Sequence, residues 1–189
     1  MAEEATRAAE KPLNEVYVTF VGLIDNAAVH RITNGMATAM GNGVDQVHLL
    51  FQSYGGAVGD GVFLYNYFRA LPIGLTLYNL GKVESIATIA FLGAKRRKVS
   101  TYATFMIHRT TITEQLATAR RLESTTKSLT LDDDRTEAIL RDHLKMPDER
   151  WKELEYHDVN FSAKDAVGFG IADEVAEFAP PPNTRMYDL

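Results

Sequence analysis

Strand-like and helix-like segments alternate along the chain up to residue 107, and this order constrains the fold more than any other feature. The expected strands are rich in β-branched and aromatic residues, and the segments between them carry apolar residues at helical spacing. Strands joined by a helix run parallel, with right-handed crossovers. The sequence therefore predicts an α/β fold with a mostly parallel sheet. The expected strands are 16–21, 47–51, 75–80 and part of 99–107, and the expected helices are 27–40, 59–71 and 85–93. Asp25 or Asn26 can cap the first of these helices.

A long polar segment, about residues 113–145, follows the last of these strands and contains neither Gly nor Pro. Its apolar residues form only a narrow stripe, and a helix with so narrow an apolar face cannot lie deep in a core. We expect a helix that projects from the body and packs against a second copy of the chain. Leu131–Asp134 is expected to interrupt it, with an aspartate capping a second helix.

The two ends of the chain are expected to lie outside the folded domain, which we place at residues 15–178. Residues 1–14 are charged and end near Pro12, which is typical of a flexible tail. The run Pro180–Pro182 marks residues 179–189 as a disordered or extended tail. Just inside the domain's end, Ser162 and Asp165 have the spacing of a capping box at a helix start.

Charge and composition exclude several classes of protein. The net charge of −5 argues against a nucleic-acid binder, and we interpret Lys95–Lys98 as a solvated turn. The absence of cysteine excludes a disulfide scaffold, a thiol nucleophile and a thiolate metal site. Residues 1–11 lack the apolar core of a secretory signal, and no apolar run approaches the roughly 20 residues of a membrane helix. We expect a soluble cytoplasmic protein without metal or cofactor.

A serine and a histidine stand at the two ends of the most apolar stretch, Gly81–His108. Ser85 opens a helix-like run four residues after Gly81, and His108 closes a strand-like run. A serine there is most often a helix cap, and a lone histidine is more often structural than catalytic. Placed side by side, however, the two residues would form a nucleophile and the base that it needs. Lys82 or Lys95 could replace the base, but neither is needed while His108 is available.

Two further groups could complete such a site. Gly55-Gly56 follows an expected strand, where a flexible backbone can approach a substrate and aim an N–H at its carbonyl oxygen. Asp158 could orient the histidine and stabilise its cation, although alone it is an ordinary loop residue. Its rivals are His157 beside it and Glu84, which is poorly placed because adjacent residues on a helix point apart.

The order and spacing of these motifs resemble those of the Clp protease proteolytic subunit family, from about Val16 to Glu174. Tyr54-Gly55-Gly56 is similar to its Ser-Pro-Gly-Gly loop, and Gly81–Ser85 to its Gly-x-x-x-Ser nucleophile turn. Met106-Ile107-His108 matches its Met-Ile-His strand end. Asp158–Ala163, with the segments 166–167 and 170–173, resembles its Asp-x-x-x-Ser-Ala…Ala-Val…Gly-Leu-Val-Asp segment.

The resemblance implies a serine endopeptidase with a crotonase-like fold, built of repeated ββα and βαβ units with a mostly parallel sheet and a projecting handle helix. It implies a catalytic triad of Ser85, His108 and Asp158, with an oxyanion hole from the backbone N–H groups of Gly55 and Ile86. The implied substrates are peptides or unfolded proteins, hydrolysed through an acyl-enzyme inside a homo-oligomeric ring or stacked rings. The implied partner is an AAA+ unfoldase; neither nucleic acid nor membrane is implied.

The sequence departs from the family pattern at several positions. Tyr54 replaces a proline, Glu84 replaces a small residue, and Arg109–Thr111 follows the histidine in place of Gln-Pro. The N-terminal segment is short and lacks the apolar and basic pattern of the family's axial loops, which argues against docking to an unfoldase.

Two functions other than that of a peptidase are compatible with the sequence. A crotonase-type acyl-CoA hydratase or hydrolase would share the fold and an oxyanion hole built from similar backbone positions. It needs no serine, histidine and aspartate in this order, so His108 and Asp158 count against it. A catalytically weak ring subunit that acts as an assembly scaffold is the non-enzymatic alternative, and the presence of all three triad residues counts against it.

Overall fold

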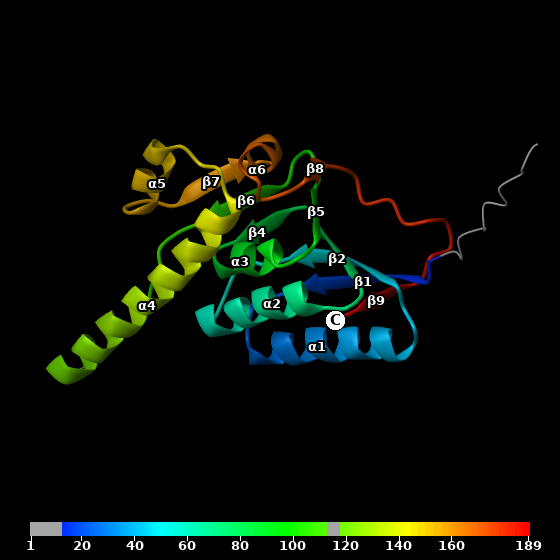
Figure 1. Ribbon diagram of the computed structural model, residues 1–189, viewed down its shortest axis with the longest axis horizontal. Helices are drawn as coiled ribbons and strands as arrows, with labels where there is room; N and C mark the ends of the chain where they lie inside the picture. Colours follow the sequence, from blue (N-terminus) through cyan, green and yellow to red (C-terminus); the bar gives the residue numbers. More distant parts are fainter. Residues whose placement is uncertain (1–12, 113–117) are drawn as a thin grey trace, which may run out of the picture.

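The computed structural model describes residues 13–112 and 118–189, and its centre is a six-stranded parallel sheet (Figure 1). The strand order is β8-β5-β3-β2-β1-β9. Every neighbouring pair is parallel, as the alternation of strands and helices predicts. The strands are β1 (Glu15–Val21), β2 (Gln46–Gln52), β3 (Gly74–Asn79), β5 (Arg96–Val99), β8 (Glu174–Val175) and β9 (Met186–Asp188).

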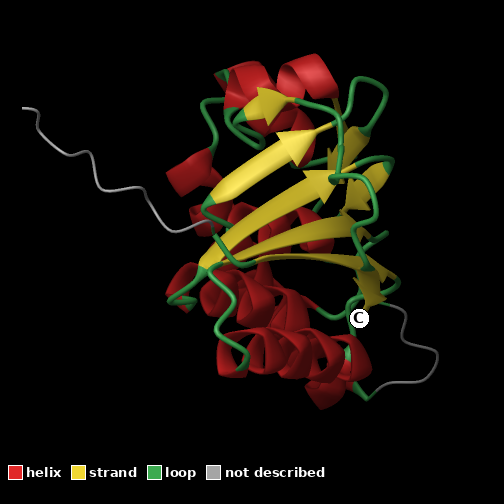
Figure 2. Cartoon of the chain, turned by 90° about the vertical axis from the view of Figure 1, so that its right-hand side faces the viewer, coloured by secondary structure: helices red, strands yellow, loops and turns green. Residues whose placement is uncertain are grey.

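Two helices, α1 (Asn26–Gly41) and α2 (Val58–Ala70), cover one face of this sheet (Figure 2). A third, α3 (Ile86–Leu92), packs against α2, and all its residues are buried. Alternate strand residues point toward the helices and form the core, among them Phe20 and Phe51, whose rings are 5.4 Å apart. Phe91 of α3 lies 6.4 Å from Phe51, so one apolar core joins the sheet to the helix that carries the candidate site.

A smaller sheet of three strands in the order β4-β6-β7 lies beside the first. Its strands are β4 (Lys82–Glu84), β6 (Thr104–Ile107) and β7 (Val159–Ser162); β4 and β6 are parallel, whereas β6 and β7 are antiparallel. A bridge between Ser53 and Val83 ties the end of β2 to this sheet. Two short helices, α5 (Asp148–Leu154) and α6 (Ala163–Phe169), flank β7.

Two of the predicted helix starts are confirmed in detail. The Asp25 side chain accepts a hydrogen bond from the Ala28 N–H and caps α1. Ser162 caps α6 in a capping box with Asp165, and Gly170 ends the helix in the left-handed conformation at φ 92°. Local sequence signals therefore determine these ends, because each cap is satisfied by residues within the same turn.

Three expectations are wrong. Residues 96–98 form most of β5 rather than a turn, because the strand is held between β3 and β8. Leu131–Asp134 does not interrupt the long helix: α4 runs from Ala119 to His143, while residues 113–117 lie outside the described residues. The C-terminal segment is not merely extended, because β9 pairs with β1 and Leu189 N–H donates to Thr19 O at 2.9 Å.

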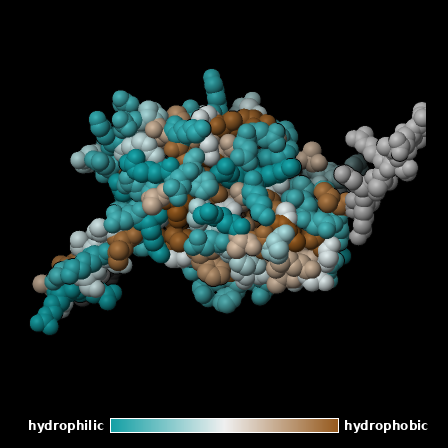
Figure 3. All heavy atoms as spheres, viewed as in Figure 1, coloured by the Kyte–Doolittle hydropathy of each residue, from teal (hydrophilic) through white to brown (hydrophobic). Residues whose placement is uncertain are grey.

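Helix α4 extends away from the body of the molecule, as its narrow apolar stripe predicts (Figure 1). Hydrophilic residues cover most of its visible surface, with hydrophobic residues between them (Figure 3). Leu122 and Leu131 are 51% and 67% exposed, and Leu140 is its one buried residue among those described. Only the C-terminal part of α4 therefore belongs to the core. No helix among the described residues has the length and hydrophobicity to cross a membrane.

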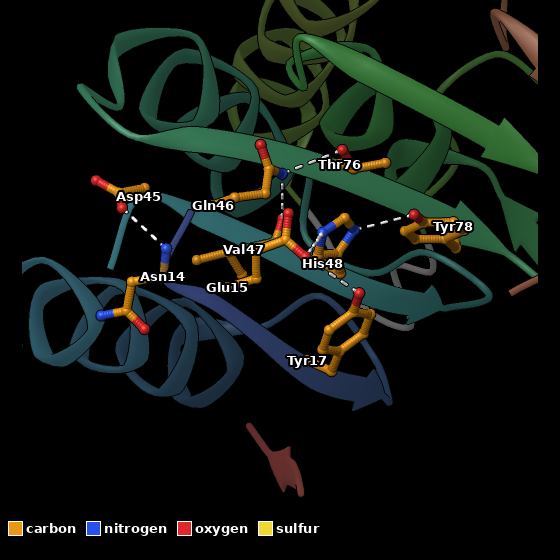
Figure 4. A network of polar contacts seen from close by, with 9 residues as sticks. All are labelled: Asn14, Glu15, Tyr17, Asp45, Gln46, Val47, His48, Thr76 and Tyr78. Atoms are coloured by element: carbon orange, nitrogen blue, oxygen red, sulfur yellow. Dashed lines mark hydrogen bonds and ion pairs between the residues drawn. The ribbon is translucent and has the colours of Figure 1, made fainter. Parts of the chain in front are cut away.

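The sheet face opposite α1 and α2 carries a polar and aromatic network around His48 (Figure 4). His48 Nδ1 lies 3.0 Å from the Tyr78 hydroxyl, its ring stacks on Tyr17 at 4.5 Å, and its Nε2 lies 3.6 Å from a Glu15 carboxylate oxygen. Burial lowers the pKa of His48, although Glu15 opposes the shift. The network links side chains of β1, β2 and β3.

A second half-buried histidine, His143, lies at the C-terminal end of α4. Its Nε2 is 3.0 Å from the hydroxyl of Tyr65, which also accepts a hydrogen bond from Arg69 at 2.8 Å. Its Nδ1 lies 3.5 Å from Arg97, which pairs with Asp173 at 3.0 Å. Burial, and then the charges of Arg97 and Arg69, lower the pKa of His143, while Asp142 opposes the shift.

This arrangement predicts that acid weakens the fold through His143. The unfolded residue binds a proton near pH 6.5, whereas the folded one resists it, so the unfolded state binds more protons as the pH falls below that value. Stability is therefore lost as the pH decreases through this window, by at most about 1.4 kcal/mol per pH unit for one proton. Urea unfolding at pH 7.5 and 5.5 should show a smaller loss for His143→Gln than for the wild type. The exposed His30→Gln control should keep the wild-type loss; equal losses in all three proteins would refute the assignment.

Candidate active site

The turn between β4 and α3 holds Ser85 in an unusual backbone conformation. Ser85 has φ 56° and ψ −132°, a region costly for any residue but glycine. Its N–H donates to Met106 O at 2.7 Å, and its carbonyl accepts from Thr88 N–H at 3.0 Å. Strand pairing on one side and the helix on the other thus impose this conformation. The Ser85 hydroxyl makes no cap for α3 and is left available for another partner.

That partner is His108, which follows β6 directly. Its Nε2 lies 2.8 Å from Ser85 Oγ, although 23 residues separate them. The pairing of β4 with β6, in which Glu84 aligns with Met106, brings the two strand ends together. A neutral imidazole at this distance can accept the hydroxyl proton, which is the geometry that a general base requires.

Asp158 lies just before β7, the strand that pairs with β6. The antiparallel register pairs Ile107 with Val159, so His108 and Asp158 are the next residues opposite each other beyond the paired strands. Both line a pocket of about 160 Å³. In the described part of the chain, no hydrogen bond or ion pair joins the two side chains. The structure therefore brings Ser85 and His108 into contact and places Asp158 near them, without closing a three-residue chain of hydrogen bonds.

Three of the four rival groups, Glu84, Lys82 and Lys95, have other partners. Glu84 pairs with Lys82 at 2.9 Å, and this hydrogen bond raises the pKa of Lys82, which disfavours the neutral amine that a base would need. Lys95 donates to Leu71 O at 3.2 Å. His157 is exposed and lines the same pocket as Asp158. His108 is thus the base that the geometry favours.

The Gly55-Gly56 turn lies against the serine. A Cβ atom on Gly55, which has φ 98°, would lie 2.7 Å from Ser85 Cβ. The Gly55 N–H donates to Ser53 Oγ at 3.1 Å. The Gly56 N–H donates to no acceptor within residues 13–112 and 118–189, and Gly56 lines the pocket beside Ser85. Ile86 opens α3, where a backbone N–H has no partner within its helix.

A pocket of about 80 Å³ opens beside Ser85 and His108. Its walls come from the turn at Gly56, from α2 and α3, from the end of β6 and the segment after His108, and from α4. Val58, Thr136 and Leu140 also line the pocket but were not predicted as site residues, because no sequence motif indicates which helix residues face it. The apolar lining residues are Val58, Ile86, Ile89, Ile107 and Leu140, and the polar ones near them include Thr110, Thr111 and Thr136.

Titratable groups elsewhere do not form a comparable site. Among the described residues, no group of three or more His, Asp or Glu side chains is arranged to hold a metal ion. The contact between Ser85 and His108 suits proton transfer from a hydroxyl to an imidazole, next to backbone N–H groups that can bind an oxyanion.

A family model described as Clp protease matches residues 1–179, a range that includes every candidate site residue named above. No curated protein matches the chain.

Proposed function

The chain belongs to the Clp protease family, and from that premise we propose that it is a serine endopeptidase that cleaves peptides or unfolded proteins inside an oligomeric chamber. The observation that carries the proposal is the 2.8 Å contact between His108 Nε2 and Ser85 Oγ at a strained turn. A serine hydroxyl is a weak nucleophile unless a base takes its proton, and this contact supplies the base.

The proposed reaction has two steps. His108 takes the Ser85 proton as the oxygen attacks the peptide carbonyl, and the imidazolium then gives that proton to the leaving amine. The products of this step are the free amine and an ester on Ser85. His108 then takes a proton from water as the water oxygen attacks the ester carbon. The ester bond to Ser85 breaks, the imidazolium gives the proton to Ser85 Oγ, and the carboxylic acid leaves.

Asp158 is proposed to orient His108 and stabilise its cation. The strand register supports this role, because it places Asp158 opposite His108 beyond the last pair, Ile107 and Val159. Asp158 and His108 line the same pocket, and the proposed contact joins the Asp158 carboxylate to His108 Nδ1. Asp158 would then fix the tautomer in which Nδ1 carries the proton and Nε2 faces Ser85.

The oxyanion hole is proposed to combine the Ile86 N–H with the Gly55-Gly56 turn. The Ile86 N–H opens a helix, so the helix dipole adds to its attraction for negative charge. In the turn, Gly56 lines the pocket and its N–H has no acceptor among the described groups, whereas Gly55 can contribute only after its bond to Ser53 Oγ is exchanged.

Two features support the chamber and the substrate class. Helix α4 exposes Leu122 and Leu131 on a projecting segment, which a second copy of the chain would bury as rings stack. The pocket beside Ser85 is walled by aliphatic side chains, which suits an apolar residue of the substrate next to the scissile bond. An AAA+ unfoldase remains a candidate partner for delivering unfolded chains.

Labelling with a fluorophosphonate probe tests the proposal. The probe should modify wild-type protein stoichiometrically, and mass spectrometry of the digest should place the adduct on Ser85. Unlabelled protein that binds acyl-CoA would favour a crotonase-type enzyme, and protein that binds neither would favour a scaffold subunit. Sedimentation of the same sample should show assemblies larger than the 21.0 kDa monomer.

A further inference from the structure

The two residues after His108 are held against α4 rather than left as a free loop. Thr110 N–H donates to Asp133 Oδ1 at 2.7 Å. Arg109 Nη2 lies 2.6 Å from Glu137 Oε2. Asp133 and Glu137 are one helical turn apart, so both carboxylates lie on the same side of α4, facing the histidine segment.

These two contacts begin where strand pairing stops. Strand β4 pairs with β6 up to Met106, and β7 pairs with it up to Ile107. His108 is the first residue beyond that pairing, and the contacts at Arg109 and Thr110 hold the chain that leaves it. The histidine backbone is therefore clamped between a sheet and a helix, which restricts the directions in which its side chain can point.

Glu137 is itself held firmly in place. Its Oε1 accepts from Arg141 at 2.7 Å while its Oε2 pairs with Arg109, and its side chain is 23% exposed. Burial alone would raise the pKa of Glu137, but hydrogen bonds from Arg141 and Arg109 prevail and lower it. The carboxylate is thus ionised at neutral pH and keeps Arg109 in one position.

The same part of α4 also forms a wall of the pocket. Thr136 and Leu140 line it together with Ser85 and His108, and they lie on either side of Glu137 in the helix. A shift of this part of α4 relative to residues 109–110 would therefore change both the position of His108 and the shape of the pocket beside Ser85.

We propose that Asp133 and Glu137 are positioning residues for His108: they hold residues 109–110 against α4 and so keep the imidazole within hydrogen-bonding distance of Ser85. The inference rests on the proposed serine peptidase function. It assigns a role in the reaction to carboxylates that touch neither the substrate nor the reacting atoms.

The test is the rate of fluorophosphonate labelling, separated into the maximal rate constant and the probe concentration that gives half of it. Asp133→Ala and Glu137→Gln should each lower the maximal rate constant about 10- to 100-fold, since a displacement of about 1 Å can cost that much. Asp133→Asn keeps an acceptor for the Thr110 N–H and should stay within about threefold of wild type. Glu123→Gln is the matched control, because Glu123 pairs with Lys127 on the exposed part of the same helix.

Three outcomes distinguish the possibilities. Slow labelling that still reaches completion in folded Asp133→Ala and Glu137→Gln, with the Asn variant and the control unchanged, supports positioning. Fast labelling of a smaller fraction of the protein, or unchanged rates in both variants, would overturn the inference while the peptidase function stands. Wild-type protein that is not labelled at all would instead overturn the proposed function. Thermal unfolding of each variant identifies loss of fold separately from loss of rate.

Discussion

Ser85→Ala and His108→Ala are each expected to lower the peptidase rate by about 10⁴- to 10⁶-fold, and the double variant is expected to be no slower than the worse single one. The reason is that the two side chains act as one unit through their 2.8 Å contact. Without the imidazole the hydroxyl keeps its proton, and without the hydroxyl the imidazole has nothing to activate. Any residual rate would come from the oxyanion hole and substrate binding alone.

The measurement is the cleavage of unfolded casein or a fluorogenic peptide by the two single variants and the double variant, each at the same assembly state. His30→Gln, a change of an exposed histidine on α1, serves as the matched control and should retain the wild-type rate. Losses that multiply in the double variant would mean that the two residues act independently, and the proposed mechanism would then be wrong. A Ser85→Ala protein that still hydrolyses peptides at the wild-type rate would have the same consequence.

Patterns within one turn or one strand were sufficient to predict much of the fold. The alternation of strands and helices gives the parallel sheet, because each segment's composition and spacing belong to that segment alone. Asp25 and Ser162 behave as predicted for the same reason: the donors that they satisfy lie within the next three residues. A helix cap depends only on residues in the same turn, so the sequence around it is enough to predict it.

The wrong predictions of secondary structure concern segments whose conformation depends on contacts with residues far away in the sequence. Residues 96–98 are charged, yet they form a strand because β3 and β8 supply backbone partners on both sides. The aspartates of Leu131–Asp134 do not break α4: Asp132 pairs with Arg135, and Asp133 accepts from the Thr110 N–H. Those partners satisfy side chains that would otherwise compete for the helix backbone.

The candidate site could be predicted in part. Ser85 and His108 could be named from the sequence because each stands at the end of an apolar run, but their contact depends on the pairing of β4 with β6. The contacts of Asp133 and Glu137 with the segment after His108 could not be predicted, since no motif near either residue indicates that it lies beside the histidine. Sequence motifs thus identified the reacting groups, whereas the residues that position them required the tertiary structure.

The turn that approaches the serine should tolerate no side chain at Gly56. This residue has φ 153°, and a Cβ there would run into the carbonyl oxygen of Ile24. Ile24 cannot retreat, because its N–H donates to Gly55 O and its carbonyl accepts from Ala57 N–H, both at 2.8 Å. A Gly56→Ala chain must therefore either strain the backbone or break this bridge between the end of β1 and the start of α2.

We expect Gly56→Ala to lower the free energy of unfolding by roughly 2–6 kcal/mol, combining backbone strain with overpacking. It should also slow fluorophosphonate labelling, because the displaced turn no longer faces Ser85. Urea unfolding provides the measurement, and Gly59→Ala is the matched control three residues later. Gly59 lies in α2 with nothing within 4 Å of a new Cβ, so alanine there should stabilise the protein by about 0.5–1 kcal/mol. If both variants unfold at the wild-type urea concentration, the turn is not the rigid wall of the site that its backbone geometry requires.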